Sequence, residues 1–165
     1  MHALLDWIRS LPAGPSVLLM AMLPIVELRG AIPFGVSVHG LGYAQVYLLA
    51  VLGNLVPILP ILLLLGPLER TVGRWGPARR FLDWVFARSR RKGAMIERVE
   101  FWGLVLFVGI PLPVTGAWTG AAAAYVFGLP LRRSLPAIVL GVCLAGLVVS
   151  LAWAAGIGVF TKLPL

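Results

Sequence analysis

The length of the uncharged runs most constrains what this chain can fold into. Four stretches contain no charged side chain: residues 10–26, 30–68, 101–131 and 134–161. The last three exceed the roughly 20 residues that an α-helix needs to cross the hydrocarbon core of a bilayer. Since only 12% of its residues are charged, the chain has too little polar surface to cover a soluble globule. We therefore expect an all-α integral membrane protein, with residues 1–165 forming one membrane domain.

The basic residues indicate how such a bundle would be oriented. Nine of the fourteen Lys and Arg residues lie between Arg70 and Arg98, in the one long polar segment. This is typical of a cytoplasmic loop, here residues 69–100, that meets anionic lipid headgroups rather than nucleic acid. Wound as a helix, residues 77–91 separate apolar from basic side chains and predict an amphipathic surface helix.

Two apolar segments, residues 15–39 and 101–131, are interrupted near their centres by proline, glycine and, in the first, charged residues. In hydrocarbon, a broken backbone is tolerated only where it is buried in protein or lines a watery cavity. If the second segment crossed the bilayer once, the basic pair at 132–133 would lie opposite the basic loop, against the positive-inside rule. We therefore predict that each segment is a re-entrant helical hairpin.

The rest of the chain completes two similar halves. Residues 1–12 predict a short interfacial helix, and residues 41–68 and 134–160 predict one transmembrane helix each. A shift of 86 positions places "GAIPFG" over "GAWTGA" and Gly42 over Gly128. The single crossing between the halves would invert the second relative to the first. The expected fold is therefore two inverted repeats, each a re-entrant hairpin plus a transmembrane helix.

A homodimer is expected, because two spanning helices and two hairpins are barely enough to enclose a polar centre from lipid. The glycines of residues 134–160 suggest that this helix forms the dimer interface, since small residues let helices approach closely in a membrane. Asn54, inside the first spanning helix, is most simply explained as a residue that hydrogen-bonds one helix to another.

Glu27 and Arg29 form the one ionised pair in the apolar body of the chain. Side chains two positions apart do not face one another on a helix, so either each has another partner or the backbone leaves the helix there. A buried ionisable residue in a membrane is a functional candidate by default. Burial favours the protonated carboxyl group and a nearby cation favours the ionised one, so Glu27 could exchange a proton for a lipophilic cation. Arg29 could hold either Glu27 or a phosphate.

The stretches "PIVELRGAIPFG" and "PLPVTGAWTGA", each followed by a spanning helix, resemble the bacterial small multi-drug export protein family. More distantly, they are similar to the DedA/VTT superfamily with its two re-entrant hairpins. The first resemblance implies a multi-pass protein of the bacterial inner membrane that exports small compounds. The second implies lipid transport, although Thr115, Trp118 and Thr119 stand where charged residues would be expected.

Three functions stay open: proton- or ion-coupled export of small lipophilic compounds, DedA-like transport of a polyprenyl phosphate or phospholipid, and membrane packing or assembly with no transported substrate. In the last case Glu27 and Arg29 would be a structural clasp. HExxH, GxSxG and cysteine–histidine metal spacings are missing from the sequence, so we expect neither an enzyme nor a cofactor. The candidate substrate- and proton-binding residues are Glu27, Arg29, Gly30, Pro33, Asn54, Pro113, Thr115, Gly116, Trp118 and Thr119.

Overall fold

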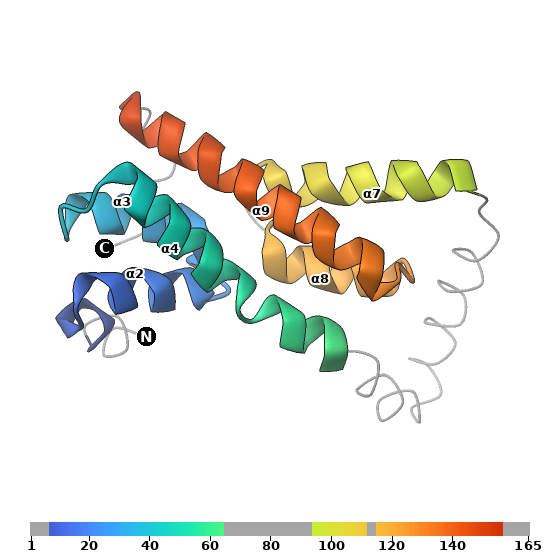
Figure 1. The fold of residues 1–165 in the computed structure, drawn as a ribbon, viewed down its shortest axis with the longest axis horizontal. Coiled ribbons are helices and arrows are strands. Elements are labelled where there is room, and N and C mark those ends of the chain that lie inside the picture. The colour runs from blue at the N-terminus through green and yellow to red at the C-terminus, as the bar shows by residue number, and fades with distance from the viewer. Residues whose placement is uncertain (1–6, 65–93, 112–114, 157–165) are drawn as a thin grey trace.

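The fold was analysed in a computed structural model that describes residues 7–64, 94–111 and 115–156 (Figure 1). These residues form helices joined by short connections, and no strand occurs among them. Two helices, Tyr43–Leu64 and Leu131–Ala154, are long and apolar enough to cross a membrane. The all-α prediction is therefore confirmed for the described part of the chain.

The first half is a three-helix unit. Its helices are α2 (Ala13–Met22), α3 (Glu27–Ser37) and α4 (Tyr43–Leu55). Each of the three packs against the other two. The close packing centres on Gly35 of α3, where an added Cβ would lie 2.8 Å from the Val17 side chain of α2 and 2.9 Å from the Val46 side chain of α4. A larger residue at Gly35 would push these helices apart.

The second half has the same plan. Its helices are α7 (Ala94–Gly109), α8 (Ala117–Val126) and α9 (Leu131–Ala154). The helix α9 packs on α7 and α8, and it also packs on α3 and α4 of the first half (Figure 1). At this junction the Tyr47 hydroxyl donates a hydrogen bond of 3.2 Å to the Cys143 carbonyl, and the Tyr47 ring lies against Gly146. The helix α9 therefore joins the two halves.

Two pairs of glycines with similar surroundings, Gly40 with Gly128 and Gly53 with Gly141, lie 88 residues apart, two more than the 86-residue shift of the sequence comparison. Gly40 (φ +64°) follows α3 and Gly128 (φ +69°) follows α8, each in the left-handed conformation that glycine adopts most readily. Gly53 of α4 packs against the Leu18 carbonyl of α2, and Gly141 of α9 packs against the Val105 carbonyl of α7.

The predicted pairing of Gly42 with Gly128 stays a prediction, and the two glycines differ in conformation. Gly42 has a φ of −64° and precedes α4 as its N-cap, whereas Gly128 ends a hairpin arm. Backbone conformation and close packing distinguish the glycines that share a structural role.

Several helix boundaries differ from those predicted. The break in the first segment is confined to residues 23–26, and helix resumes at Glu27, so that Gly30 and Pro33 lie inside α3. Pro33 removes the N–H that would bond the carbonyl four residues earlier, which is tolerated in this helix. The predicted spanning helix 41–68 contains a turn at residues 56–57 before it continues to Leu64.

Two other helices begin earlier than predicted. Residues 94–100, assigned to the basic loop, already belong to α7, and α9 begins at Leu131, so that Arg132 and Arg133 lie in its first turn. Charged residues such as Glu100 and Arg132 are good helix formers, so the end of an apolar run does not mark the end of a helix. Residues 7–10 of the predicted interfacial helix are helical. The predicted amphipathic helix, residues 77–91, lies outside the described residues.

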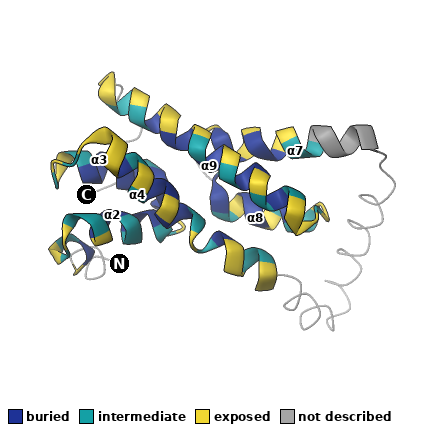
Figure 2. Ribbon diagram, viewed as in Figure 1, coloured by how far each residue is buried: buried dark blue, intermediate teal, exposed yellow. Residues whose placement is uncertain are grey.

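The helices carry apolar side chains both inside the bundle, where they are buried, and on its outside, where they are exposed (Figure 2). In the 18-residue apolar stretch of each helix, only 33% is buried for Tyr43–Leu64 and 39% for Leu131–Ala154. The outer faces of both helices carry leucines. On α4 and its continuation these are Leu48, Leu52, Leu59 and Leu63, and on α9 they are Leu140, Leu144, Leu147 and Leu151. A helix in the core of a soluble protein would be mostly buried. Exposed apolar faces of this length are suited to contact with lipid.

Two of the glycines expected at a dimer interface make close contacts within the chain. Gly141 packs against Val108 of α7, and Gly146 packs against Tyr47 of α4, both in the same chain. The close approach that these glycines permit is therefore used within the protomer. The expected homodimer stays a prediction.

Candidate functional site

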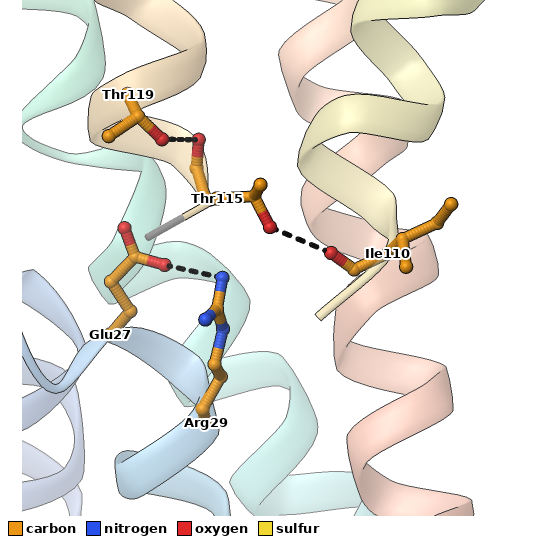
Figure 3. A network of polar contacts seen from close by, with 6 residues as sticks. Glu27, Arg29, Ile110, Thr115 and Thr119 are labelled. Atoms are coloured by element: carbon orange, nitrogen blue, oxygen red, sulfur yellow. Dashed lines mark hydrogen bonds and ion pairs between the residues drawn. The ribbon is translucent and has the colours of Figure 1, made fainter. Parts of the chain in front are cut away.

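Glu27 begins α3 directly after the turn at the tip of the first hairpin. Its φ is +50°, and it is the one non-glycine residue with a positive φ among the described residues. This conformation costs a residue with a Cβ roughly 1–2 kcal/mol, so contacts elsewhere must hold it in place. Its carboxylate points toward the N-terminal end of α8 in the other half (Figure 3).

The Glu27 carboxylate caps α8. It accepts a hydrogen bond from the backbone N–H of Trp118, in the first turn of that helix. Gly116, the N-cap residue, supplies no side-chain cap of its own. A Cβ at Gly116 would overlap both carboxylate oxygens, so the glycine leaves the space that Glu27 fills. A carboxylate is favourable there because the first N–H groups of a helix lack internal partners and carry partial positive charge.

Besides the partial positive charge at the N-terminus of α8, the guanidinium of Arg29 places a full positive charge beside the Glu27 carboxylate. Its Nη2 atom lies 3.9 Å from Oε2 of Glu27, and the side chains are only 16% and 9% exposed, respectively (Figure 3). At this distance the contact is an ion pair rather than a hydrogen bond. Residues two apart can meet here because Glu27 leaves helical geometry at φ +50°. Both explanations that the spacing allowed apply to Glu27, which leaves helical geometry and also binds the Trp118 N–H of another helix.

Two threonines shape the neighbouring tip of the second hairpin. The Thr115 hydroxyl donates a hydrogen bond of 3.0 Å to the Ile110 carbonyl, which joins the two ends of the connection between α7 and α8. The Thr119 hydroxyl donates one of 3.2 Å to the Gly116 carbonyl (Figure 3). Both hydroxyls therefore bond the backbone around the position that receives Glu27.

Asn54 makes no helix-to-helix hydrogen bond among the described residues, where the sequence suggested one. It is 1% exposed, and neither its Nδ2 nor its Oδ1 atom has a hydrogen-bond partner among the residues that the structure describes. The buried indole Nε1 of Trp118 likewise has no hydrogen-bond partner among the described residues. Two candidate residues thus keep unused hydrogen-bonding groups inside the bundle.

The other candidates occupy different places. Gly30 is buried in α3, where a Cβ would overlap the Val26 side chain, and Pro33 is buried one turn further on. Pro113 lies outside the described residues. No group of three or more His, Cys, Asp and Glu residues that could hold a metal occurs in the described ranges.

The structure thus brings Glu27, Arg29, Gly116 and Trp118 together at the meeting point of two hairpins. Sequence reasoning named all four residues but missed that Glu27 caps α8. The available signal was the start of a helix at "GAWTGA", whose N-cap position holds glycine where Ser, Thr, Asp or Asn usually serves.

The described helices include two that are long and apolar enough to cross a membrane, and a buried ion pair lies on α3 where the two hairpins meet. These features indicate a membrane protein. Its family follows from comparison with known proteins. Residues 27–148 match the small multi-drug export protein family, and the chain belongs to this family. The resemblance of the sequence to the small multi-drug export family is thereby confirmed. A search of curated proteins and a search of solved structures gave no match.

Proposed function

We propose that this protein is a proton-coupled transporter that exports small lipophilic compounds, with Glu27 as the residue that exchanges the proton. The observation that supports this most directly is the position of its carboxylate. It joins the tip of the first hairpin to the start of α8 in the second, and it is buried beside one cation. A titratable group that holds two halves together can link their separation to proton binding.

In this proposal the ionised Glu27 keeps the hairpin tips together. A charge-assisted hydrogen bond, such as the one from Trp118, is roughly twice as strong as a neutral one. Protonation would weaken that bond and would remove the charge that balances Arg29 and the N-terminus of α8. The tips would then separate more easily. Loss of the proton on the other side of the membrane would restore the contact.

The membrane arrangement is part of the proposal. Both hairpins are re-entrant, the halves form an inverted repeat, and the basic loop faces the cytoplasm of a bacterial inner membrane. The matched roles of Gly40 with Gly128 and of Gly53 with Gly141 support the repeat. In an inverted pair the two tips would meet near the bilayer midplane, where secondary transporters place their substrate sites.

One observation favours lipid-phosphate transport as a second candidate. Arg29 and the N-terminus of α8 both face a single anionic group, and both are suited to phosphate. A phosphate would have to replace the Glu27 carboxylate at these positions. Neutralising Glu27 would therefore assist phosphate binding, whereas it would abolish proton-coupled export.

Transport by purified protein in proteoliposomes tests the proposal. With an imposed pH gradient, the decay of the gradient on addition of a lipophilic compound, either neutral (triphenylphosphine oxide) or cationic (ethidium), is compared for wild type, Glu27→Gln and Glu100→Gln. The last makes the same chemical change on α7, away from the tips. We expect Glu27→Gln to abolish the response and Glu100→Gln to keep it. Normal transport by a stable Glu27→Gln protein would overturn the proposal, and binding of a polyprenyl phosphate by that variant would favour the second candidate.

A further inference from the structure

Asn54 has hydrogen-bonding capacity that the described protein does not use. Its side chain is 1% exposed, and both its donor and its acceptor lack partners among the described residues. Buried polar groups are almost always hydrogen-bonded, and one that is not requires an explanation. Because the residue is enclosed within one chain, a second protomer cannot reach it. A small molecule that enters the bundle can.

Asn54 lies at the same depth as Glu27. The helices α3 and α4 run antiparallel, joined by residues 38–42, and Gly35 lies against Val46 at their shared end. Glu27 precedes Gly35 by eight residues, and Asn54 follows Val46 by eight. At a rise of 1.5 Å per residue, both lie about 12 Å from that contact in the same direction. Asn54 therefore belongs to the layer of the hairpin tips.

Asn54 also points toward the junction of the two halves. On α4, Val46 and Gly53 contact the first hairpin, while Tyr47 and Val51 contact α9. Successive residues of an α-helix are separated by roughly 100° around its axis, which places Asn54 between these two groups. The amide thus enters the layer from the first half, in the direction of the second.

The backbone of Trp118 reaches the same layer from the second half. Its backbone N–H binds Glu27, and its indole Nε1 is buried without a hydrogen-bond partner in the described residues. The charges of this layer are already matched, because Glu27 balances both Arg29 and the N-terminus of α8. The unused groups are two donor nitrogens, Nδ2 of Asn54 and Nε1 of Trp118, together with the amide oxygen of Asn54 and the aromatic ring of Trp118.

We propose that this layer binds an uncharged lipophilic compound that carries a hydrogen-bond acceptor, with Asn54 and Trp118 as binding residues. The inference rests on the proposed transport function and specifies its substrate class. A lipophilic cation would have to compete with Arg29 and α8 for the Glu27 carboxylate. A neutral compound leaves that contact intact and satisfies the two unused donors.

Two probes of similar aromatic bulk test this class directly. Triphenylphosphine oxide is neutral and has a strong acceptor, whereas tetraphenylphosphonium is a cation without one. Equilibrium binding of each probe is measured on purified protein in detergent, with no pH gradient. We expect triphenylphosphine oxide to bind more tightly. Loss of one hydrogen bond should weaken its binding about tenfold in Asn54→Leu and in Trp118→Phe, which keeps the ring.

The matched control is Gln45→Leu, which makes the same kind of change at an exposed position of α4 and should bind like wild type. Tighter binding of tetraphenylphosphonium, dependent on Glu27, would overturn the proposal. Equal binding of triphenylphosphine oxide to wild type and Asn54→Leu would overturn it too, as would an absence of binding. Because the assay needs no gradient, its failure is distinct from a failure of proton coupling.

Discussion

The carboxylate of Glu27 accepts a hydrogen bond from the backbone N–H of Trp118, a residue 91 positions further along the chain. This contact combines two requirements of a membrane bundle. A buried carboxylate needs donors, and the first turn of α8 needs an acceptor because its N-cap is glycine. Each half therefore satisfies a polar group of the other, so the contact can stabilise the fold and respond to protonation.

Gly116→Ala should separate the hairpin tips. The new Cβ would overlap the Glu27 carboxylate, and overpacking of this kind costs typically 1–3 kcal/mol. Thermal unfolding in detergent measures the loss. The control is Gly103→Ala in α7, where nothing lies within 4 Å and the better helix propensity of alanine should add up to about 1 kcal/mol. Equal stability of the two variants would mean that the tips are not closely packed.

A double-mutant cycle should reveal how strongly Glu27 and Arg29 depend on each other. Glu27→Leu removes the charge that faces a mostly buried guanidinium, and breaking a buried pair from one side typically costs about 3–5 kcal/mol. The double change, Glu27→Leu with Arg29→Leu, should cost less than the sum of the two single changes. The free energy of unfolding of the four proteins checks this. Strict additivity would show that the ion pair contributes nothing.

The sequence predicted the elements better than it predicted their limits. Long apolar runs identified both spanning helices, and the proline and charge pattern located a break near Glu27. The break is shorter than the pattern suggested, because Gly30 and Pro33 are compatible with the helix that follows. The early start of α7 was missed because a helix continues beyond the apolar run that reveals it.

The candidate site was predictable in composition but not in geometry. A charged pair in an apolar run indicates a special position, and all four residues at the tip contact were named. That Glu27 caps α8 depends on a φ of +50° and on the docking of two segments 91 residues apart. Neither feature follows from local propensity. Likewise, the unused amide of Asn54 could be recognised only once its surroundings were known.

Two glycines should prove equivalent across the halves. Gly53→Ala places a Cβ against the Leu18 carbonyl, and Gly141→Ala places one 2.9 Å from the Val105 carbonyl. Backbone atoms yield less readily than flexible side chains, so each variant should lose about 1–3 kcal/mol of stability. Thermal unfolding, with Gly103→Ala as the reference, provides the measurement. A variant as stable as this reference would contradict the close contact at its position.

Asn54→Leu should make the empty protein more stable. Replacing a buried, unbonded amide with an apolar side chain of similar size removes a penalty of about 1–3 kcal/mol. The melting temperature without ligand should therefore rise, while Gln45→Leu, at an exposed site on the same helix, should change it little. A large loss of stability would instead indicate that Asn54 holds a structural bond in the membrane-embedded protein.

The two basic clusters should lie on the same side of the membrane if the second hairpin is re-entrant. The chain has one cysteine, so a Cys143→Ser background permits single cysteines to be introduced elsewhere. In intact cells, an impermeant thiol reagent should label Gly42→Cys, at the exposed start of α4, but neither Ser89→Cys in the basic loop nor Arg132→Cys in the first turn of α9. The physical reason is that Lys and Arg are retained in the cytoplasm, and a hairpin returns its second end to the side of its first. Labelling of position 132 from outside would show that residues 101–131 cross the membrane, which would remove the inverted repeat and the meeting of the tips at the midplane.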